Sequence, residues 1–184
     1  LSVYFLEDYR VTLSELLMPA SDISEQISLA GTEASGTGNM KLMLNGAITL
    51  GTLDGANIEI KEAVGDENII IFGMKTEEVN DLKRSGYDPG AYYKSNPVIK
   101  SCIDRMYHGI NGCSFSEVAN SLKDADPYMV LADFDSYRKA QAHSSECYKN
   151  SEKWAKMSLN NIAGAGIFSA DRAVTEYAKD IWGL

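Results

Sequence analysis

Between residues 31 and 44 the sequence reads Gly31-Thr32-Glu33-Ala34-Ser35-Gly36-Thr37-Gly38-Asn39-Met40-Lys41-Leu42-Met43-Leu44. Gly36 and Gly38 allow the backbone to turn sharply and to approach another group closely. Residues 39 to 44 contain good helix formers and no β-branched residue. The pattern predicts a glycine-bearing loop that runs into a helix from about Thr37 to Leu44, ended by the pair Asn45-Gly46 as a left-handed cap.

The start of this helix is a candidate phosphate site. Its first N–H groups have no partner within the helix and point back toward the loop, which favours an anion. Lys41 follows Thr37 by four residues, so the two share a helix face about 6 Å apart. Pyridoxal phosphate carries its phosphate arm and its aldehyde on neighbouring ring carbons, and it would fit a phosphate at Thr37 and Gly38 with an amine one turn away.

Two simpler interpretations of this stretch remain open. A Gly-Thr-Gly loop is often only a tight connection, and most lysines are solvated surface charges. Two other phosphate motifs are excluded. The stretch is not a Walker A motif, because Leu42 follows the lysine, and it is not a dinucleotide fingerprint, because Lys41 stands where the third glycine would be.

The composition indicates one globular domain of 184 residues with 45% hydrophobic residues. A formal net charge of -9 argues against nucleic acid or an anionic membrane as the main partner. A local helix terminus can still bind a phosphate despite this overall charge.

The few cysteines and histidines predict neither a metal site nor a disulfide framework. Cys102, Cys113 and Cys147 show no zinc-type spacing with each other or with His108 and His143. An odd number of cysteines fits reduced thiols and a cytoplasmic protein. No apolar run is long enough to span a bilayer, and no cleavable leader is evident. The chain opens on an apolar run without a methionine, which indicates a piece of a longer protein.

Residues 1–87 alternate strand-like and helical patterns, which predicts a β-α-β core with a parallel sheet. The expected strands are Val3–Leu6, Ala47–Leu50 and Asn68–Gly73. The expected helices are Val11–Leu17, a segment from Ala56 to Ala63 closed by Gly65, and Glu77–Arg84. Asp54 and Thr76 are the predicted N-caps of the second and third of these helices. Ser21–Glu25 has a capping-box pattern, Asp22 with Glu25, that predicts a single helical turn.

Residues 88–184 are predicted to be mainly helical. The expected helices are Ala91–Tyr93, Pro97–Tyr107, Phe115–Leu122, Phe134–Cys147, Ser151–Ile162 with Ser151 as its cap, and Ser169–Trp182. Tyr128–Ala132 is ambiguous between a strand and a connection. Apolar residues in the last helix have the three-four spacing of a packed stripe. We interpret Trp154 and Trp182 as packing residues, the two histidines as surface groups and the cysteines as inert.

The residues around the loop resemble a known family. Glu33-Ala34-Ser35-Gly36-Thr37-Gly38-Asn39-Met40-Lys41 is similar to the cofactor signature of the α-glucan phosphorylases, which include glycogen, starch and maltodextrin phosphorylases. Other segments resemble the family in order along nearly the whole chain. They are Phe5 to Val11, Ser24 to Ser28, Gly51 to Asn57, Ile71 to Gly73, and Phe168 to Arg172 with Ile181 to Gly183.

The resemblance implies a retaining glycosyltransferase of the GT-B architecture, which has two Rossmann-like domains with the active site between them. Residues 1–184 would be a single piece of the C-terminal domain, with a Rossmann-like α/β parallel sheet and a helical second half. The implied reaction is phosphorolysis of terminal α-1,4-glucosidic bonds of glycogen, starch or maltodextrin by inorganic phosphate, which releases glucose 1-phosphate. The phosphate arm of pyridoxal phosphate would relay a proton.

The resemblance also implies roles for individual residues. Lys41 matches the lysine that holds the cofactor as a Schiff base, and Thr37 and Gly38 match the backbone donors to its phosphate. Tyr9 and Arg10 match catalytic side chains near the paired phosphates, where a fixed cation offsets negative charge. The wall that binds the sugar hydroxyls is matched by Glu33, Ala34, Ser35 and Gly36. In the simpler interpretations, Tyr9 and Arg10 close a strand edge and Glu33 caps a helix.

Only the C-terminal part of the family is matched. The N-terminal domain, the glucan-binding surfaces, the contacts of a homodimer and further phosphate-binding basic residues would lie upstream. The last helices of the family cross back toward the N-terminal domain, so Ser169–Trp182 would lack its docking surface here. We therefore expect no phosphorylase activity from these 184 residues alone. Two alternatives stay open: a non-catalytic module that binds phosphate or a sugar phosphate, and a folded piece whose cofactor pocket is empty.

Overall fold

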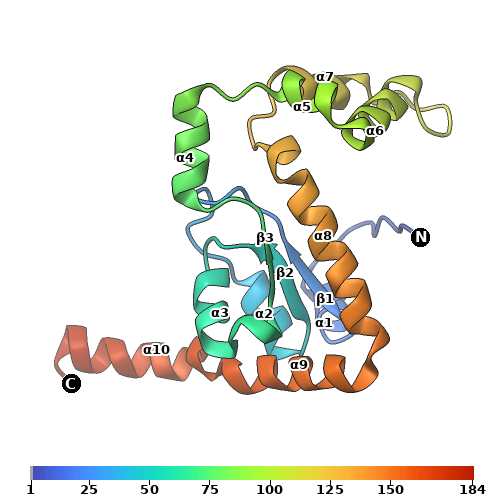
Figure 1. Cartoon of the computed structure of the whole chain (residues 1–184). Coiled ribbons are helices and arrows are strands. Elements are labelled where there is room, and N and C mark those ends of the chain that lie inside the picture. The colour runs from blue at the N-terminus through green and yellow to red at the C-terminus, as the bar shows by residue number, and fades with distance from the viewer. Residues whose placement is uncertain (1) are drawn as a thin grey trace.

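The computed structural model describes residues 2–184 and is built around a three-stranded parallel sheet (Figure 1). The strands β1 (Ile23–Gln26), β2 (Ile48–Thr52) and β3 (Ile70–Phe72) are hydrogen-bonded in that order. Ile23 lies opposite Ile48, and Leu50 lies opposite Ile70. The prediction of an α/β fold with a parallel sheet in the first half is confirmed, with β2 and β3 each within two residues of the expected position.

The first strand is not where the sequence predicts it. Val3–Leu6 has no regular structure and is exposed, with Phe5 at 90%, while Leu1 lies outside the described residues. The strand is instead Ile23–Gln26, where a helical turn with a capping box was expected. An apolar run becomes a strand only where a neighbour takes up its backbone hydrogen bonds, and pairing with β2 outweighs the local preference of a short polar segment.

The helices of the first half, one before β1 and one after each of the next two loops, lie close to their predicted positions. They are α1 (Val11–Leu17), α2 (Gly38–Leu44) and α3 (Asn57–Val64), followed by a short 3-10 turn, η1 (Asp66–Asn68). Gly46, at φ 86°, ends α2 with its N–H on the Met43 carbonyl, as the predicted left-handed cap requires. Gly65, at φ 79°, closes α3 as predicted.

Two of the predicted N-caps differ from the structure by one position. The helix α4 (Thr76–Ser85) begins at Thr76, with Lys75 before it, and the Glu78 carboxylate accepts the Lys75 backbone N–H. The helix α9 (Ser151–Gly164) is capped by the Asn150 side chain, which accepts the Lys153 N–H. In each case the residue before the predicted cap occupies the N-cap position.

The second half is helical, as predicted. Its further elements are α5 (Pro89–Ser95), α6 (Pro97–His108), α7 (Ser116–Asp124), α8 (Val130–Lys149), the 3-10 turn η2 (Ala165–Phe168), α10 (Ala170–Tyr177) and the π-helical turn η3 (Ala178–Trp182). The segment left ambiguous between strand and connection is not a strand: residues 130–132 form the first turn of α8, which begins four residues before the predicted Phe134, and Met129 at φ 50° is its N-cap. No helix in residues 2–184 is both long enough and apolar enough to cross a membrane.

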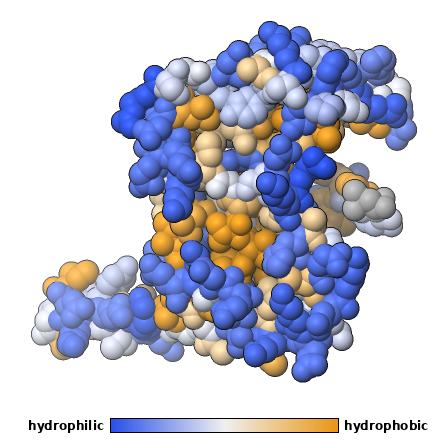
Figure 2. All heavy atoms as spheres, in the orientation of Figure 1, coloured by the Kyte–Doolittle hydropathy of each residue, from blue (hydrophilic) through white to orange (hydrophobic). Residues whose placement is uncertain are grey.

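The core is divided between the two faces of the sheet. Alternate residues of a strand point to opposite faces, and in β3 Ile70 and Phe72 pack with α8 and α9 while Ile71 packs with α2 and α3. In Figure 2, apolar side chains gather in the middle of the visible face, between hydrophilic surfaces. Trp154 lies in this core at 7% exposure, which confirms its predicted packing role.

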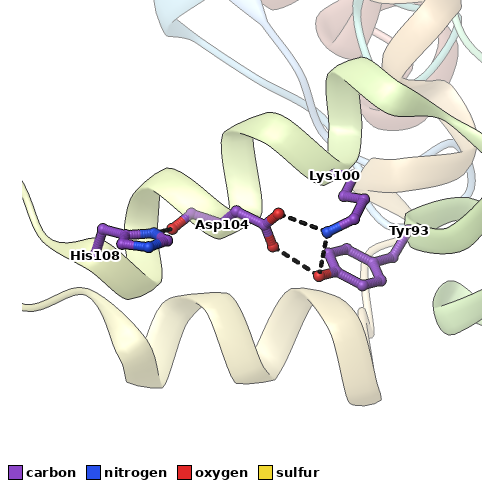
Figure 3. Close-up of polar contacts among 4 residues, drawn as sticks. All are labelled: Tyr93, Lys100, Asp104 and His108. Atoms are coloured by element: carbon purple, nitrogen blue, oxygen red, sulfur yellow. Dashed lines mark hydrogen bonds and ion pairs between the residues drawn. The ribbon is translucent and has the colours of Figure 1, made fainter.

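Helices α5, α6 and α7 cluster at one end of the molecule, beside the start of α8 (Figure 1). Their surface carries a charged contact, shown in Figure 3: the Lys100 ammonium lies 2.6 Å from Asp104 Oδ2, and the Tyr93 hydroxyl donates to Asp104 Oδ1. The hydrogen bond from Lys100, aided by the one from Tyr93, lowers the pKa of the Asp104 carboxyl. His108 and His143 are exposed, as predicted.

The C-terminal helix extends away from the body (Figure 1). The predicted apolar stripe of α10 and η3 is present, but the structure leaves Val174, Tyr177, Ile181 and Trp182 exposed. Trp182 is 59% exposed, so its predicted packing role is wrong for this chain. The three-four spacing defines an apolar face, but it does not supply a surface to cover that face.

Candidate functional site

The loop of residues 31–37, here called the signature loop, leaves the carboxyl end of β1 and leads through α2 to β2. In open sheets with parallel strands, ligands bind outside the carboxyl ends of the strands. The sequence order alone therefore places the predicted site residues from Glu33 to Lys41 at the edge where such a fold usually binds its ligand.

Asp54 fixes the first half of the signature loop. It is 7% exposed and follows β2, and its Oδ2 accepts the backbone N–H groups of Thr32, at 3.1 Å, and Glu33, at 2.8 Å. The prediction that Asp54 caps the following helix is wrong, because α3 has Ala56 at its N-cap and no side-chain cap. The carboxylate is used by a loop that lies more than twenty residues earlier in the chain.

The second half of the loop is fixed by a chain of buried amides. Asn39, in the first turn of α2, donates through Nδ2 to Asn57 Oδ1 at 2.9 Å, and Asn57 donates to the Thr52 carbonyl at 2.9 Å. Both asparagines are buried. Buried polar groups stay satisfied only in defined geometry, so these bonds set the position of α2 relative to β2 and α3. This role is not predictable from local sequence, where its one trace is an asparagine in each of two largely apolar segments.

Close packing of the strands behind the loop depends on a glycine. A Cβ on Gly51 would lie 2.6 Å from the Gln26 carbonyl oxygen and 2.8 Å from Asn57 Nδ2. The absence of a side chain there lets β1, β2 and the Asn57 amide meet. A second contact joins the end of β2 to the segment after β1: the Thr52 hydroxyl donates to the Ser28 carbonyl at 2.6 Å.

Lys41 and Thr37 lie together as the spacing predicts. The buried side of α2 carries Asn39 and Met43, and Lys41 is exposed. None of the ion pairs among residues 2–184 includes Lys41. Within the same residues, the backbone N–H groups of Thr37 and Gly38 have no protein acceptor. Unused N–H donors one helical turn before an unpaired lysine are a donor set that fits a phosphate-bearing aldehyde such as pyridoxal phosphate.

The predicted sugar-binding residues line the exposed side of the same loop. Glu33, Ala34 and Ser35 are exposed, and Gly36 is half-buried. A Cβ on Gly36 would lie 3.0 Å from Asn39 Oδ1, so glycine allows the loop to close over the amide that orients α2.

Tyr9 and Arg10 lie apart from this set. Both are exposed in the segment before α1, where Arg10 Nη1 pairs with Asp8 Oδ2 at 3.0 Å. The simpler interpretation, that they close a strand edge, is wrong because no strand precedes them in the described residues. Within residues 2–184, no group of three or more His, Cys, Asp or Glu side chains is arranged to hold a metal ion.

Comparison with known proteins gives the same family as the signature loop. The family model of the carbohydrate phosphorylases matches residues 1–184. The chain belongs to the carbohydrate phosphorylase family. It is 48% identical over 188 residues to the brain form of glycogen phosphorylase from Homo sapiens, and 49% identical over 187 residues to the brain form from Ovis aries. The muscle form from Bos taurus is 48% identical over 188 residues.

Each of these matches covers 100% of the chain and 22% of the relative. As a member of the carbohydrate phosphorylases, the chain therefore corresponds to about a fifth of the length of these glycogen phosphorylases.

Proposed function

We propose that this chain is the cofactor-bearing part of an α-glucan phosphorylase of the GT-B architecture. One observation carries the proposal: the unused N–H donors of Thr37 and Gly38 stand at the start of the short helix that bears Lys41, and buried polar contacts anchor that helix. The substrates would be an α-1,4-glucan and inorganic phosphate, and the product glucose 1-phosphate. The bond between the terminal glucosyl carbon and the glycosidic oxygen breaks, a phosphate oxygen bonds to that carbon, and the released glucan hydroxyl gains the proton.

The residues of the chain have distinct tasks in this reaction. Lys41 Nζ holds pyridoxal phosphate covalently, and the N–H groups of Thr37 and Gly38 bind its phosphate arm. When bound, the cofactor supplies the phosphate group that relays a proton to the substrate phosphate. Residues 33–36 bind the sugar hydroxyls and orient the glucosyl unit. The anchor from Asp54 to Glu33 keeps that wall in place before substrate arrives, which lowers the entropic cost of reaching the transition state.

Tyr9 and Arg10 are proposed to act beside the paired phosphates in the longer protein. The Arg10 guanidinium can offset the accumulated negative charge. Its pairing with the exposed Asp8 is a surface contact, and contacts of that kind contribute about 0–1 kcal/mol. Arg10 can therefore give up its contact with Asp8 and pair with a phosphate at little cost in free energy. The N-terminal domain of the same protein and a second copy in a homodimer would complete the enzyme.

The test is borohydride reduction of the full-length protein, purified with its cofactor, followed by peptide mapping. A pyridoxyl group on the peptide that contains Lys41 supports the proposal, and a pyridoxyl group on another lysine overturns it. Lys41→Ala should lose the adduct and phosphorolysis of maltodextrin together. A matched control is Lys61→Ala: Lys61 is a half-buried lysine paired with Asp66, away from the signature loop, and the variant should keep both the adduct and the activity.

Binding of phosphate without phosphorolysis in the full-length protein would favour the non-catalytic alternative. A folded full-length protein that takes up no pyridoxal phosphate would favour the interpretation of an empty pocket. The 184 residues alone should release no glucose 1-phosphate from maltodextrin, because they contain only one wall of the proposed site.

A further inference from the structure

A small apolar hollow lies at the carboxyl ends of β1 and β3, under the first turns of α8. Its volume is about 180 Å³. Its walls include Ile27 and Leu29 after β1, Phe72 at the end of β3, and Asp133, Phe134 and Tyr137 of α8. The Phe72 and Tyr137 rings meet edge to face, with their centroids 5.1 Å apart. No residue from Glu33 to Lys41 lines the hollow, so it is separate from the proposed cofactor site.

Asp133 is the one charged group in the wall of this hollow. It is 8% exposed, and its Oδ1 accepts the Met74 backbone N–H at 2.8 Å. Within residues 2–184, Oδ2 accepts no hydrogen bond. A Cβ on Gly73 would lie 2.8 Å from Oδ2, so glycine there lets the turn after β3 close against the carboxylate.

The surroundings of Asp133 disfavour its negative charge. Burial raises the pKa of the Asp133 carboxyl, the Met74 N–H opposes that rise, and the negative charges of Glu78 and Asp126 add to it. Oδ2 is not among the buried polar atoms that lack a partner, so it keeps contact with solvent at the hollow. A carboxylate in so apolar a wall is stabilised by an opposite charge, and a cationic group placed at Oδ2 would supply that charge and a hydrogen bond.

We propose that this hollow, here called the Asp133 hollow, binds a single-ring aromatic compound that carries a cationic amine or amidine. The apolar and aromatic walls match a flat ring, and Asp133 Oδ2 matches the cation. The volume excludes larger ligands, because sites for drug-sized molecules have about 300–1,000 Å³. The wall contains no basic side chain, so anionic ligands such as phosphates are disfavoured.

The location supports a ligand site as well as the chemistry does. Folds of this kind bind ligands at the carboxyl edge of the parallel sheet. Binding pockets usually have apolar walls with a few polar groups, and often include a residue whose pKa is shifted. The hydrogen bond to Met74 explains why an acceptor stands at residue 133. It does not explain a charged acceptor, since an asparagine would serve the Met74 N–H equally well.

The probe is benzamidine, titrated into the full chain by isothermal calorimetry and by NMR. Benzamide, its neutral counterpart of the same shape, should bind about tenfold or more weakly, because it cannot pair with the carboxylate. Asp133→Asn should weaken benzamidine by a similar factor while it keeps the acceptor for Met74. The matched control is Asp135→Asn, an exposed acid two residues along α8 that does not line the hollow.

Three results would overturn the proposal: no binding of benzamidine, equal binding of benzamide, or unchanged affinity in Asp133→Asn. The comparison of benzamidine with benzamide needs no variant, so it decides the question even where Asp133→Asn fails to fold. Benzamidine should also shift the NMR signals of Phe72 and Tyr137 and leave those of the signature loop in place. Loss of the Lys41 adduct in the borohydride test would not affect these outcomes.

Discussion

Asp54 Oδ2 accepts the backbone N–H of Glu33 at 2.8 Å, and this contact joins the end of β2 to the loop that carries the family signature. The same oxygen accepts the Thr32 N–H at 3.1 Å. The acidic residue after one strand therefore sets the shape of the loop that follows the neighbouring strand. Since the two strands are adjacent in the sheet, the geometry of the proposed sugar-binding wall depends on the sheet itself.

Asp54→Ala should free the signature loop and destabilise the fold. The substitution removes a charged acceptor shared by two N–H groups, and hydrogen bonds to charged groups each contribute about 1.5–3 kcal/mol. We expect the free energy of unfolding to fall by about 2 kcal/mol, because water can hydrogen-bond to the freed N–H groups and offset part of the loss. Denaturant unfolding measures the loss, and amide exchange at Thr32 and Glu33 should become faster.

Asp66→Ala is the matched control for Asp54→Ala. Asp66 is exposed and makes one ion pair with Lys61 at 3.0 Å. Its removal should change the free energy of unfolding by about 0.5 kcal/mol or less. Equal losses in the two variants would show that the loop anchor has no special role.

Gly51→Ala should be among the most damaging small substitutions in the chain. The added methyl group would lie 2.6 Å from the Gln26 carbonyl oxygen, in a fully buried strand between two others. Overpacking of this kind costs about 1–3 kcal/mol. The control is Gly166→Ala, whose methyl group would meet nothing within 4 Å. Thermal unfolding of the two variants separates them, and a Gly51→Ala protein as stable as Gly166→Ala would contradict the packing seen here.

Replacement of the two tryptophans by alanine should change the free energy of unfolding by very different amounts. Trp154 packs in the core beside Tyr148, with ring centroids 5.1 Å apart, and Trp154→Ala should cost about 3–5 kcal/mol. Trp182 is exposed on the C-terminal helix, and Trp182→Ala should change the free energy of unfolding of this chain by about 0.5 kcal/mol or less. Denaturant unfolding of both variants is the measurement. A large loss in Trp182→Ala would mean that the terminal helix packs against the body.

Asp133→Asn should raise stability at neutral pH. Burial raises the pKa of Asp133 in the folded state above its usual 3.8, so the folded chain binds the proton more tightly than the unfolded chain. The stability due to the protonated form is fully present below that value and is lost as the pH rises through the folded-state pKa. Asparagine mimics the protonated form, so it avoids this loss.

The check on Asp133 is denaturant unfolding at pH 7 and at pH 3.5. The gain from Asp133→Asn should be largest at pH 7 and much smaller at pH 3.5, where the Asp133 carboxyl is mostly protonated in the folded chain because its pKa is raised above 3.8. Asp135→Asn, an exposed neighbour on α8, should show no such dependence. A gain that is equal at the two pH values would show that charge burial is not its cause.

Several elements were predictable because their signals are local. Helix α2 and its Gly46 cap follow from helix formers that end in a residue able to take a positive φ. The spacing of Thr37 and Lys41 follows from the helical repeat, and the apolar runs of β2 and β3 fix which segments are buried. The helical second half follows from its three-four periodicity.

Other features depend on partners that are distant in sequence. Val3–Leu6 has the composition of a strand but no neighbour to pair with, whereas the polar Ile23–Gln26 is a strand because β2 lies beside it. Trp154 and Trp182 have similar sequence patterns, and only the position of a packing surface makes one buried and the other exposed.

The sequence by itself determined the family and the placement of Lys41 one turn after Thr37, because both follow from contiguous residues. Only the tertiary structure decided that Asp54 anchors Glu33, that Asn39 and Asn57 join α2 to α3, and that Asp133 faces an apolar hollow. These contacts link residues eighteen or more positions apart. Their formation depends on which strands pair, and a hydrogen bond between distant groups exists only when the fold has brought its donor and acceptor into reach.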